Sequence, residues 1–199
     1  MVKYIYILLG IYTCNEILRI MSNIAKKICI VGDFGVGKTS LIRRFVERQF
    51  SDRYLSSVGV KIYRKVVEVN GKNHQEELTV QLVIWDLEGS NKFKKITPTY
   101  LQGASAVIIV GDVNRQETLV HIAEHINIFL SINPTGLIVV AFNKMDLTDE
   151  EKVSIIINNY QYQEQERVIA HYPTSAKTGL YIDEMFEKLA NRIISGVEG

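Results

Sequence analysis

The sequence predicts one α/β domain: a mostly parallel six-stranded sheet with one antiparallel strand and helices on both faces. Three observations support this prediction. Short apolar runs alternate with segments of helical periodicity from residue 26 onward. A glycine-rich loop, residues 32–40, joins the first apolar run to the first helical segment. The pair Asn70-Gly71 separates two extended segments, which indicates a hairpin and therefore one antiparallel pair.

The elements follow in order along the chain. Apolar runs and alternating patterns predict strands at 28–31, 60–69, 78–85, 106–110, 137–142 and 168–170. Helical periodicity predicts helices at about 38–48, 119–130, 149–160 and 182–193. Residues 87–103 have weak periodicity and predict a loop that becomes helical in part.

The composition is that of an ordinary globular protein. The chain has 199 residues, of which 47% are hydrophobic and 23% charged, enough for one domain with a sizeable core. A net charge of +1 without basic and aromatic residues interleaved predicts no nucleic-acid partner. Two cysteines, Cys14 and Cys29, exclude a disulfide framework and favour the reducing cytoplasm.

The first twenty residues do not fit the α/β pattern. The apolar run from Tyr4 to Tyr12 is shorter than the roughly 20 residues that cross a bilayer, and no signal-peptide cleavage pattern follows it. We interpret residues 1–24 as an N-terminal extension, with Met21 as the initiator, before a domain at 25–199. A membrane-tethering segment is the alternative.

The glycine-rich loop has the pattern G-x-x-x-x-G-K-T, which is typical of phosphate binding. Its backbone N–H groups and the following helix N-terminus would surround phosphate oxygens, whereas the alternative is an ordinary glycine turn. Lys38 would contact the β- and γ-phosphates, and the Thr39 hydroxyl would bind Mg²⁺. The predicted phosphate-binding residues are Gly32, Gly35, Val36, Gly37, Lys38, Thr39 and Ser40.

Three further clusters of candidates follow predicted strands, at the edge where parallel sheets bind ligands. Asp86 would hold Mg²⁺ through a water, and the N–H of Gly89 would meet a γ-phosphate. By itself this D-x-x-G pattern is equally typical of a turn that ends a strand.

The second strand end carries Asn143, Lys144 and Asp146. A carboxylate accepts two hydrogen bonds from the N1–H and amino group of guanine, which adenine does not offer, so Asp146 would select guanine. Asn143 would fix the geometry and the Lys144 stem would pack on the base. After the last strand, the backbone of Ser175, Ala176 and Lys177 would meet the guanine O6.

In this order the motifs G-x-x-x-x-G-K-T, D-x-x-G, N-K-x-D and S-A-K resemble the Ras superfamily of small GTPases, and its Rab-like branch most of all. The resemblance covers about residues 26–195. It implies a P-loop NTPase fold of the Ras-like G-domain type and a switch that binds GTP or GDP with Mg²⁺. It also implies a monomer whose partners are effector, exchange and GTPase-activating proteins.

The same resemblance implies roles for a segment after the first helix, where Phe50, Tyr54 and Ser57 keep the family's register. Phe50 would stack on guanine. The alternative interpretation of Phe50 is an aromatic residue that packs in the core at the end of the helix. The hydroxyl of Ser57 would bind Mg²⁺ and respond to the presence of the γ-phosphate.

Two departures from the family concern hydrolysis. Ser90 stands where the family usually has a water-orienting glutamine, and Phe34 where it has a small or polar residue. With Lys38, Ser57, Gly89 and Ser90 as catalytic residues, we expect GTP binding with slow hydrolysis. The alternative is a GTP-binding interaction module with negligible hydrolysis, and an excised Roc-type domain is a third interpretation.

Two remaining features have simpler interpretations. Residues 193–199 contain no C-a-a-X cysteine, so we expect no lipid anchor at the C-terminus. His121 and His125 have the four-residue spacing of a metal pair, but no third ligand is apparent. We therefore expect both histidines on a solvated helix face.

Overall fold

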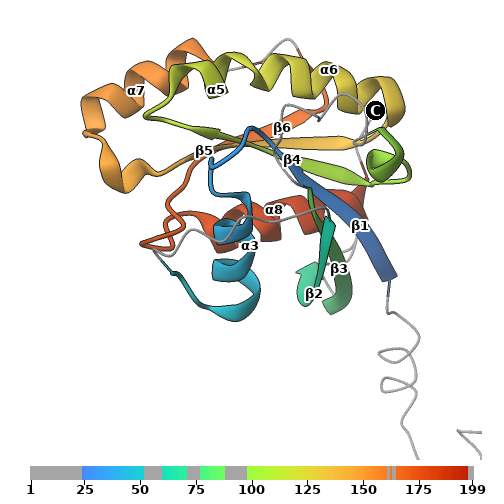
Figure 1. Cartoon of the computed structure of the whole chain (residues 1–199). Coiled ribbons are helices and arrows are strands. Elements are labelled where there is room, and N and C mark those ends of the chain that lie inside the picture. Colours follow the sequence, from blue (N-terminus) through green and yellow to red (C-terminus); the bar gives the residue numbers. More distant parts are fainter. Residues whose placement is uncertain are drawn as a thin grey trace, which may run out of the picture.

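The computed structural model describes residues 24–51, 60–70, 77–87, 98–160, 162 and 165–196 (Figure 1). One six-stranded sheet has the order β2-β3-β1-β4-β5-β6. All neighbouring strands are parallel except β2 and β3, which pair antiparallel from Val60↔Leu87 to Asn70↔Glu77. The predicted fold class, including the single antiparallel pair, is confirmed.

The bounds of the elements are close to those predicted. The strands are β1 (Ile24–Val31), β2 (Val60–Asn70), β3 (Glu77–Leu87), β4 (Ala106–Asp112), β5 (Leu137–Asn143) and β6 (Val168–Pro173). The helices are α3 (Lys38–Glu47), α5 (Gln116–Val120), α6 (Ile122–Ile132), a 3₁₀ turn (Met145–Leu147), α7 (Glu150–Asn159) and α8 (Ile182–Ser195). Residues 98–101 are also helical, as expected for part of the loop at 87–103.

Helices cover both faces of the sheet. In Figure 1, α5, α6 and α7 lie on one side and α3 and α8 on the other. Every residue of β4 and β5 is buried, because central parallel strands are covered on both faces. One core cluster includes Phe45 of α3 and Phe186 of α8, whose rings stack at 4.0 Å, and a second cluster includes Phe129 of α6.

Two local expectations are wrong. The strand predicted to begin at residue 28 begins at Ile24, since its polar start pairs with β3 from Ile24↔Val80 onward. The single helix predicted at 119–130 is divided into α5 and α6 at His121.

Residues 1–23 and the last three residues lie outside the described residues, so the predictions about Met21 and the C-terminal anchor stay predictions. Among the described helices, none is long and apolar enough to cross a membrane.

Candidate functional site

The glycine-rich loop follows β1 directly and ends where α3 begins. Gly32 has φ 140° and Gly37 has φ 102°, values that L side chains rarely adopt. A Cβ atom at Gly32 would overlap the carbonyl oxygen of Val110 in β4, and one at Gly37 would overlap the amide of Asn143. The two glycines therefore let the loop lie against the ends of β4 and β5.

Lys38 is the first residue of α3 and its side chain is buried inside the loop. Its ammonium donates to the carbonyl oxygens of Gly32 at 2.9 Å and Asp33 at 2.8 Å. The loop thus holds a positive charge beside the N-terminus of a helix, where anions bind favourably.

The next residue of α3 reaches the end of β3. The Thr39 hydroxyl donates to Oδ2 of Asp86 over 2.6 Å, and Asp86 is fully buried. Parallel pairing of β3 with β1, including Ile30↔Asp86, positions this carboxylate beside the loop. Within the described part of the chain, no group of three or more His, Cys, Asp or Glu side chains is arranged to hold a metal ion.

Asn143, at the end of β5, joins three segments. Its Nδ2 donates to the Val36 carbonyl of the loop at 2.9 Å. Its Oδ1 accepts from the Ala176 N–H at 3.2 Å and from the Thr174 hydroxyl at 3.3 Å. The glycine-rich loop, the N-K-x-D motif and the S-A-K motif are therefore one hydrogen-bonded unit, as their common position at strand ends predicts.

A second contact links the same two motifs. The Ser175 hydroxyl donates to Oδ1 of Asp146 at 2.5 Å and accepts from the Thr178 N–H at 3.1 Å. Asp146 is exposed, and Lys144 has φ 71° at the turn between β5 and the 3₁₀ segment. The Asp146 carboxylate is therefore oriented by its neighbour and accessible to a ligand.

Sequence reasoning missed Asp112, the last residue of β4. One of its oxygens, Oδ2, lies 2.7 Å from Nζ of Lys144 and 3.2 Å from Nε of Arg115. Burial alone would raise the pKa of Asp112, but the hydrogen bonds from Lys144, the Asn114 N–H and Arg115 outweigh it and hold that pKa below its ordinary value. The sequence signal that could have identified Asp112 as a site residue was its position at the end of a predicted strand.

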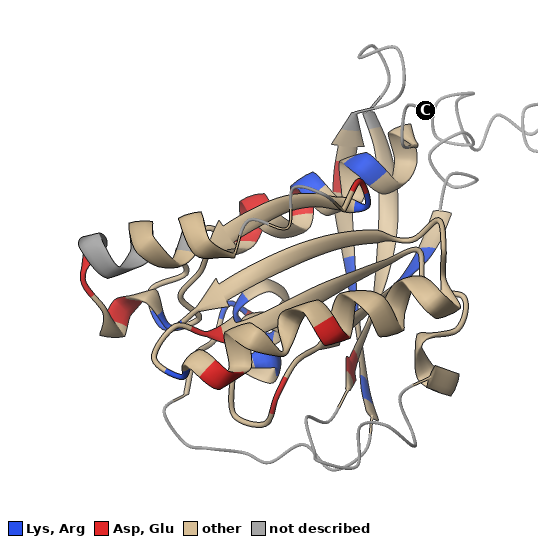
Figure 2. Cartoon of the chain, turned by 90° about the horizontal axis from the view of Figure 1, so that it is seen from above, with Lys and Arg blue, Asp and Glu red and all other residues tan. Residues whose placement is uncertain are grey.

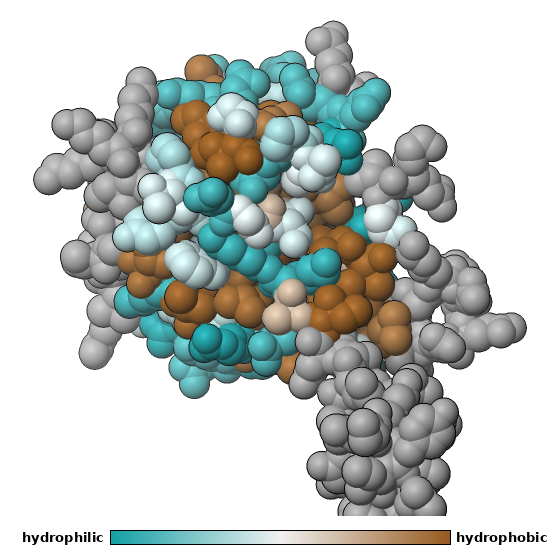
Figure 3. All heavy atoms as spheres, turned by 90° about the vertical axis from the view of Figure 1, so that its right-hand side faces the viewer, coloured by the Kyte–Doolittle hydropathy of each residue, from teal (hydrophilic) through white to brown (hydrophobic). Residues whose placement is uncertain are grey.

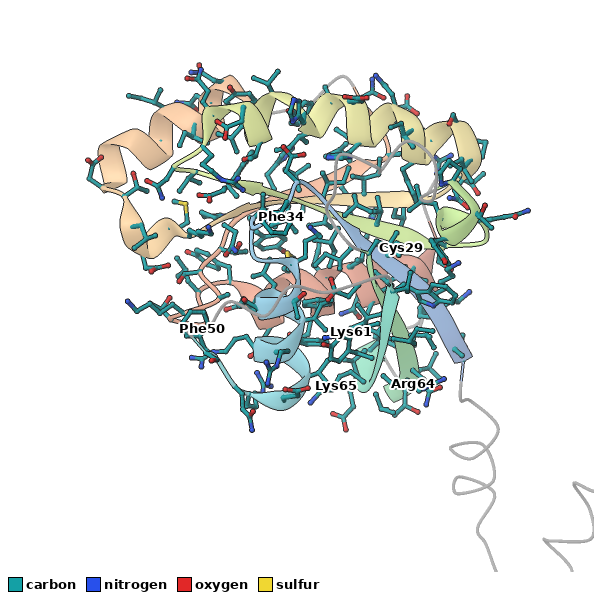
Figure 4. The ribbon with its side chains drawn as sticks, viewed as in Figure 1. Cys29, Phe34, Phe50, Lys61, Arg64 and Lys65 are labelled. Carbon is teal, nitrogen blue, oxygen red and sulfur yellow. The ribbon has the colours of Figure 1, made fainter. Side chains whose placement is uncertain are left out.

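Arg115 extends this network to the glycine-rich loop, because its Nη2 donates to the Phe34 carbonyl at 2.7 Å. The Phe34 side chain is 52% exposed. Phe34 and Phe50 lie at either end of α3 (Figure 4), and Phe50 packs partly against the core cluster of α3 and α8. The helix-end packing considered for Phe50 is thus present, and its contact with guanine stays a prediction.

Three predicted catalytic residues, Ser57, Gly89 and Ser90, lie outside the described residues together with Tyr54. Their roles stay predictions.

The histidine pair departs from the sequence expectation. His125 is buried, and its Nε2 lies 3.5 Å from Oδ1 of Asp33 in the loop. His121 is exposed, and its Nδ1 lies 2.7 Å from Oδ2 of the same carboxylate. The expectation of a solvated face is confirmed for His121 and wrong for His125, because the start of α6 lies against the glycine-rich loop.

Comparison with known proteins identifies the family. The sequence model of the Ras family matches residues 27–195. The Ras-related protein Rab5 of Nicotiana tabacum is 32% identical over 173 residues, which cover 86% of this chain and 82% of the relative. The Ras-related protein Rab-1C of Dictyostelium discoideum is 35% identical over 168 residues, covering 84% and 80%. The Ras-related protein Rab-22A of Mus musculus is 32% identical over 170 residues, covering 85% and 84%.

These matches extend over nearly all of the residues that form the sheet, the helices and the hydrogen-bonded unit at the strand ends. The chain therefore belongs to the Ras family and is a Rab-like, GTP-binding small GTPase.

Proposed function

We propose that this GTPase binds GTP or GDP together with Mg²⁺ at the carboxyl edge of the sheet and hydrolyses GTP slowly. The observation that supports this site is the hydrogen-bonded unit around Asn143, which connects the loop to the N-K-x-D and S-A-K motifs. In the proposed site the loop and Lys38 contact the phosphates, while Asp146, Lys144 and the backbone of Ser175 to Lys177 contact guanine.

The Thr39 and Asp86 side chains fit a Mg²⁺ ion. Mg²⁺ prefers oxygen ligands and is usually held by one or two protein groups together with phosphates and waters. A hydroxyl and a carboxylate that lie 2.6 Å apart beside the loop supply such oxygens. Thr39 would bind the ion directly, Asp86 through a water, and Ser57 would add a second hydroxyl. The bound ion would neutralise charge on the β- and γ-phosphates.

Guanine selectivity is testable at Asp146. Asparagine at this position presents an amide N–H₂ in place of one acceptor oxygen, so Asp146→Asn should shift the preference from guanine toward xanthine. Competition of GDP and XDP for the purified protein measures this preference. Identification of the nucleotide retained through purification provides the matching wild-type result, and an unchanged preference in the variant would remove Asp146 from the assigned role.

The proposal of slow hydrolysis depends on Ser90 and Phe34. A serine side chain is too short to orient the water that a glutamine orients from the same backbone position. Lys38 still neutralises phosphate charge, so GTP binding is retained while turnover is slow. The exposed phenyl ring of Phe34, 52% accessible at the loop, favours the second candidate, in which the protein acts only through effector contact.

Single-turnover GTP hydrolysis separates the two candidates. A measurable but slow rate supports the slow switch, and no turnover over hours supports the interaction module. A rate equal to that of a glutamine-bearing relative would contradict both. Phe34→Gly, alone and combined with Ser90→Gln, tests whether the phenyl ring or the missing glutamine limits the rate.

We propose that effectors contact the face of β2 and β3 opposite the α3–α8 core. β2 begins directly after residues 52–59 and β3 ends directly before residues 88–97, the two segments expected to respond to the γ-phosphate. Ile62 and Val66 of β2 are exposed, and Figure 3 shows hydrophobic residues gathered in separate patches among polar ones. Basic Arg64 lies between them in sequence and on the same face of the strand, because side chains alternate along a strand (Figure 4). A partner with apolar and acidic residues would match this face.

A further inference from the structure

The carboxylate of Asp33, the second residue of the glycine-rich loop, faces two imidazole rings. His121, between α5 and α6, donates from Nδ1 to Oδ2 of Asp33 over 2.7 Å. His125, one helical turn later, lies with Nε2 at 3.5 Å from Oδ1. Residues four apart share one face of a helix. The two histidines therefore lie on the same side of α6, and each is close to a different oxygen of the Asp33 carboxylate.

Asp33 connects these histidines to the phosphate-binding lysine. Its backbone oxygen accepts from Nζ of Lys38 over 2.8 Å, so a shift of Asp33 displaces an acceptor of the ammonium group. The His125 side chain is 8% exposed and that of Asp33 26% exposed. The contact is therefore partly shielded from water, where electrostatic attraction is stronger than at the surface.

We propose that His121 and His125 are positioning residues for nucleotide binding. Through Asp33 they hold the first half of the loop, and with it the Lys38 ammonium, in the conformation that receives phosphate. This proposal rests on the proposed binding of a guanine nucleotide at the loop. The pair contacts neither phosphate nor base in it, so its effect is carried by Asp33 alone.

The surroundings of the two rings differ. The charged groups that face the pair are Asp33 in the loop, Glu124 on α6 and Lys38 on α3. Burial lowers the pKa of His125, and the opposing attraction of Asp33 does not overcome that effect, so His125 resists protonation. His121 is the more exposed ring. His121 nevertheless makes the shorter contact with the Asp33 carboxylate, 2.7 Å against 3.5 Å for His125.

The test is the dissociation rate of a fluorescent GDP analogue from the full chain. His121→Leu and His125→Leu keep an apolar side chain of similar size without the donor, and each should release GDP about three- to tenfold faster. His125→Gln, which keeps an N–H₂ near the Nε2 position, should restore most of the wild-type rate. Asn127→Leu, an exposed polar-to-leucine change on the same helix, is the matched control and should leave the rate unchanged.

His121→Asn separates positioning from simple packing. Its amide N–H₂ replaces the Nδ1–H donor to Asp33, so the release rate of this variant should match wild type, whereas His121→Leu should not. In an Asp33→Ala background, His121→Leu should have no additional effect, because the partner is already absent.

The opposite results overturn the proposal. These are an unchanged release rate in His121→Leu with a wild-type thermal midpoint, or additive effects of Asp33→Ala and His121→Leu. They leave the guanine-nucleotide function intact. Failure of the wild-type protein to bind GDP at all would instead overturn that function, and the positioning role with it.

Discussion

The Asp112 carboxylate is almost inaccessible to water, and its Oδ2 atom is held by Lys144 and Arg115. Asp112→Asn would replace the charge with a neutral amide and leave two cations without a counter-ion. We expect the free energy of unfolding to fall by about 1–3 kcal/mol, the cost of disrupting hydrogen bonds to a buried charged group. Urea denaturation at neutral pH measures this loss.

The contribution of Asp112 to the free energy of unfolding depends on pH in a defined direction. Because the folded-state pKa of Asp112 is lowered below its ordinary value of 3.8, its contribution is fully present above that value. It is lost as the pH falls through the folded pKa. Asp183→Asn is the matched control, since Arg48 and Asp183 pair at the surface with side chains 62% and 41% exposed. Equal losses in the two variants would contradict the assigned role of burial.

Individual residues differ in how far the sequence reveals them. Lys38, Asn143 and Asp146 were predicted because each belongs to a local pattern whose chemistry is specific. Asp112 belongs to no such pattern, and its partners meet it only when β4, α5 and the turn after β5 come together. His125 was misassigned because helical periodicity identifies the side that faces the sheet and contains no information about a loop beside the helix.

At the scale of elements, the loop between β1 and α3 depends on the absence of a side chain at Gly37. Gly37→Ala would combine backbone strain at φ 102° with overlap of the Asn143 amide. Because Asn143 joins the loop to the S-A-K motif, we expect loss of GDP binding by at least about tenfold as well as lower stability. Isothermal titration with GDP and a thermal melt measure the two effects.

Gly103→Ala is the control for the effect of backbone strain alone. Gly103 has φ 71°, but an added Cβ would meet no atom within 4 Å. This variant should lose about 1 kcal/mol of stability and keep GDP binding. Weakened binding in Gly103→Ala, or normal binding in Gly37→Ala, would contradict the role assigned to the overlap with Asn143.

The sequence predicts strands most accurately where every residue of the strand is buried. β4 and β5 are buried at every position, and most of each strand, 106–110 and 137–142, is an uninterrupted apolar run in the sequence. The start of β1 was missed because Lys26 and Lys27 interrupt the apolar pattern. Their strand pairing is set by β3, and Nζ of Lys27 lies 4.1 Å from the centroid of the Trp85 ring.

For the molecule as a whole, charge is distributed rather than concentrated. Figure 2 shows basic and acidic residues interspersed along the elements, in agreement with the net charge of +1. The pH dependence of stability near neutrality therefore depends on particular buried groups rather than on repulsion across a charged face. Two histidines are such groups, the buried His125 and the partly buried His171, since burial lowers the pKa of each.

A histidine whose folded-state pKa is depressed contributes stability that is fully present above its ordinary value of 6.5 and declines as the pH falls toward the folded pKa. The urea midpoint should accordingly fall between about pH 7.5 and about pH 5.5. His171 lies in β6 with its ring 6.2 Å from that of Phe142 and 6.1 Å from that of Tyr162, and its buried Nε2 has no hydrogen-bond partner among the described residues.

His171→Phe would keep the stacked ring and remove the nitrogen that must be charged in a buried site. We expect a neutral or slightly raised midpoint at about pH 7.5 and a smaller decrease at about pH 5.5. Addition of His125→Leu should remove most of the remaining decrease, because the second buried imidazole is then absent as well. Urea titrations of the three proteins at both pH values measure these midpoints. A decrease in His171→Phe as large as that of the wild-type protein would show that protonation of this partly buried ring does not limit stability at mildly acidic pH.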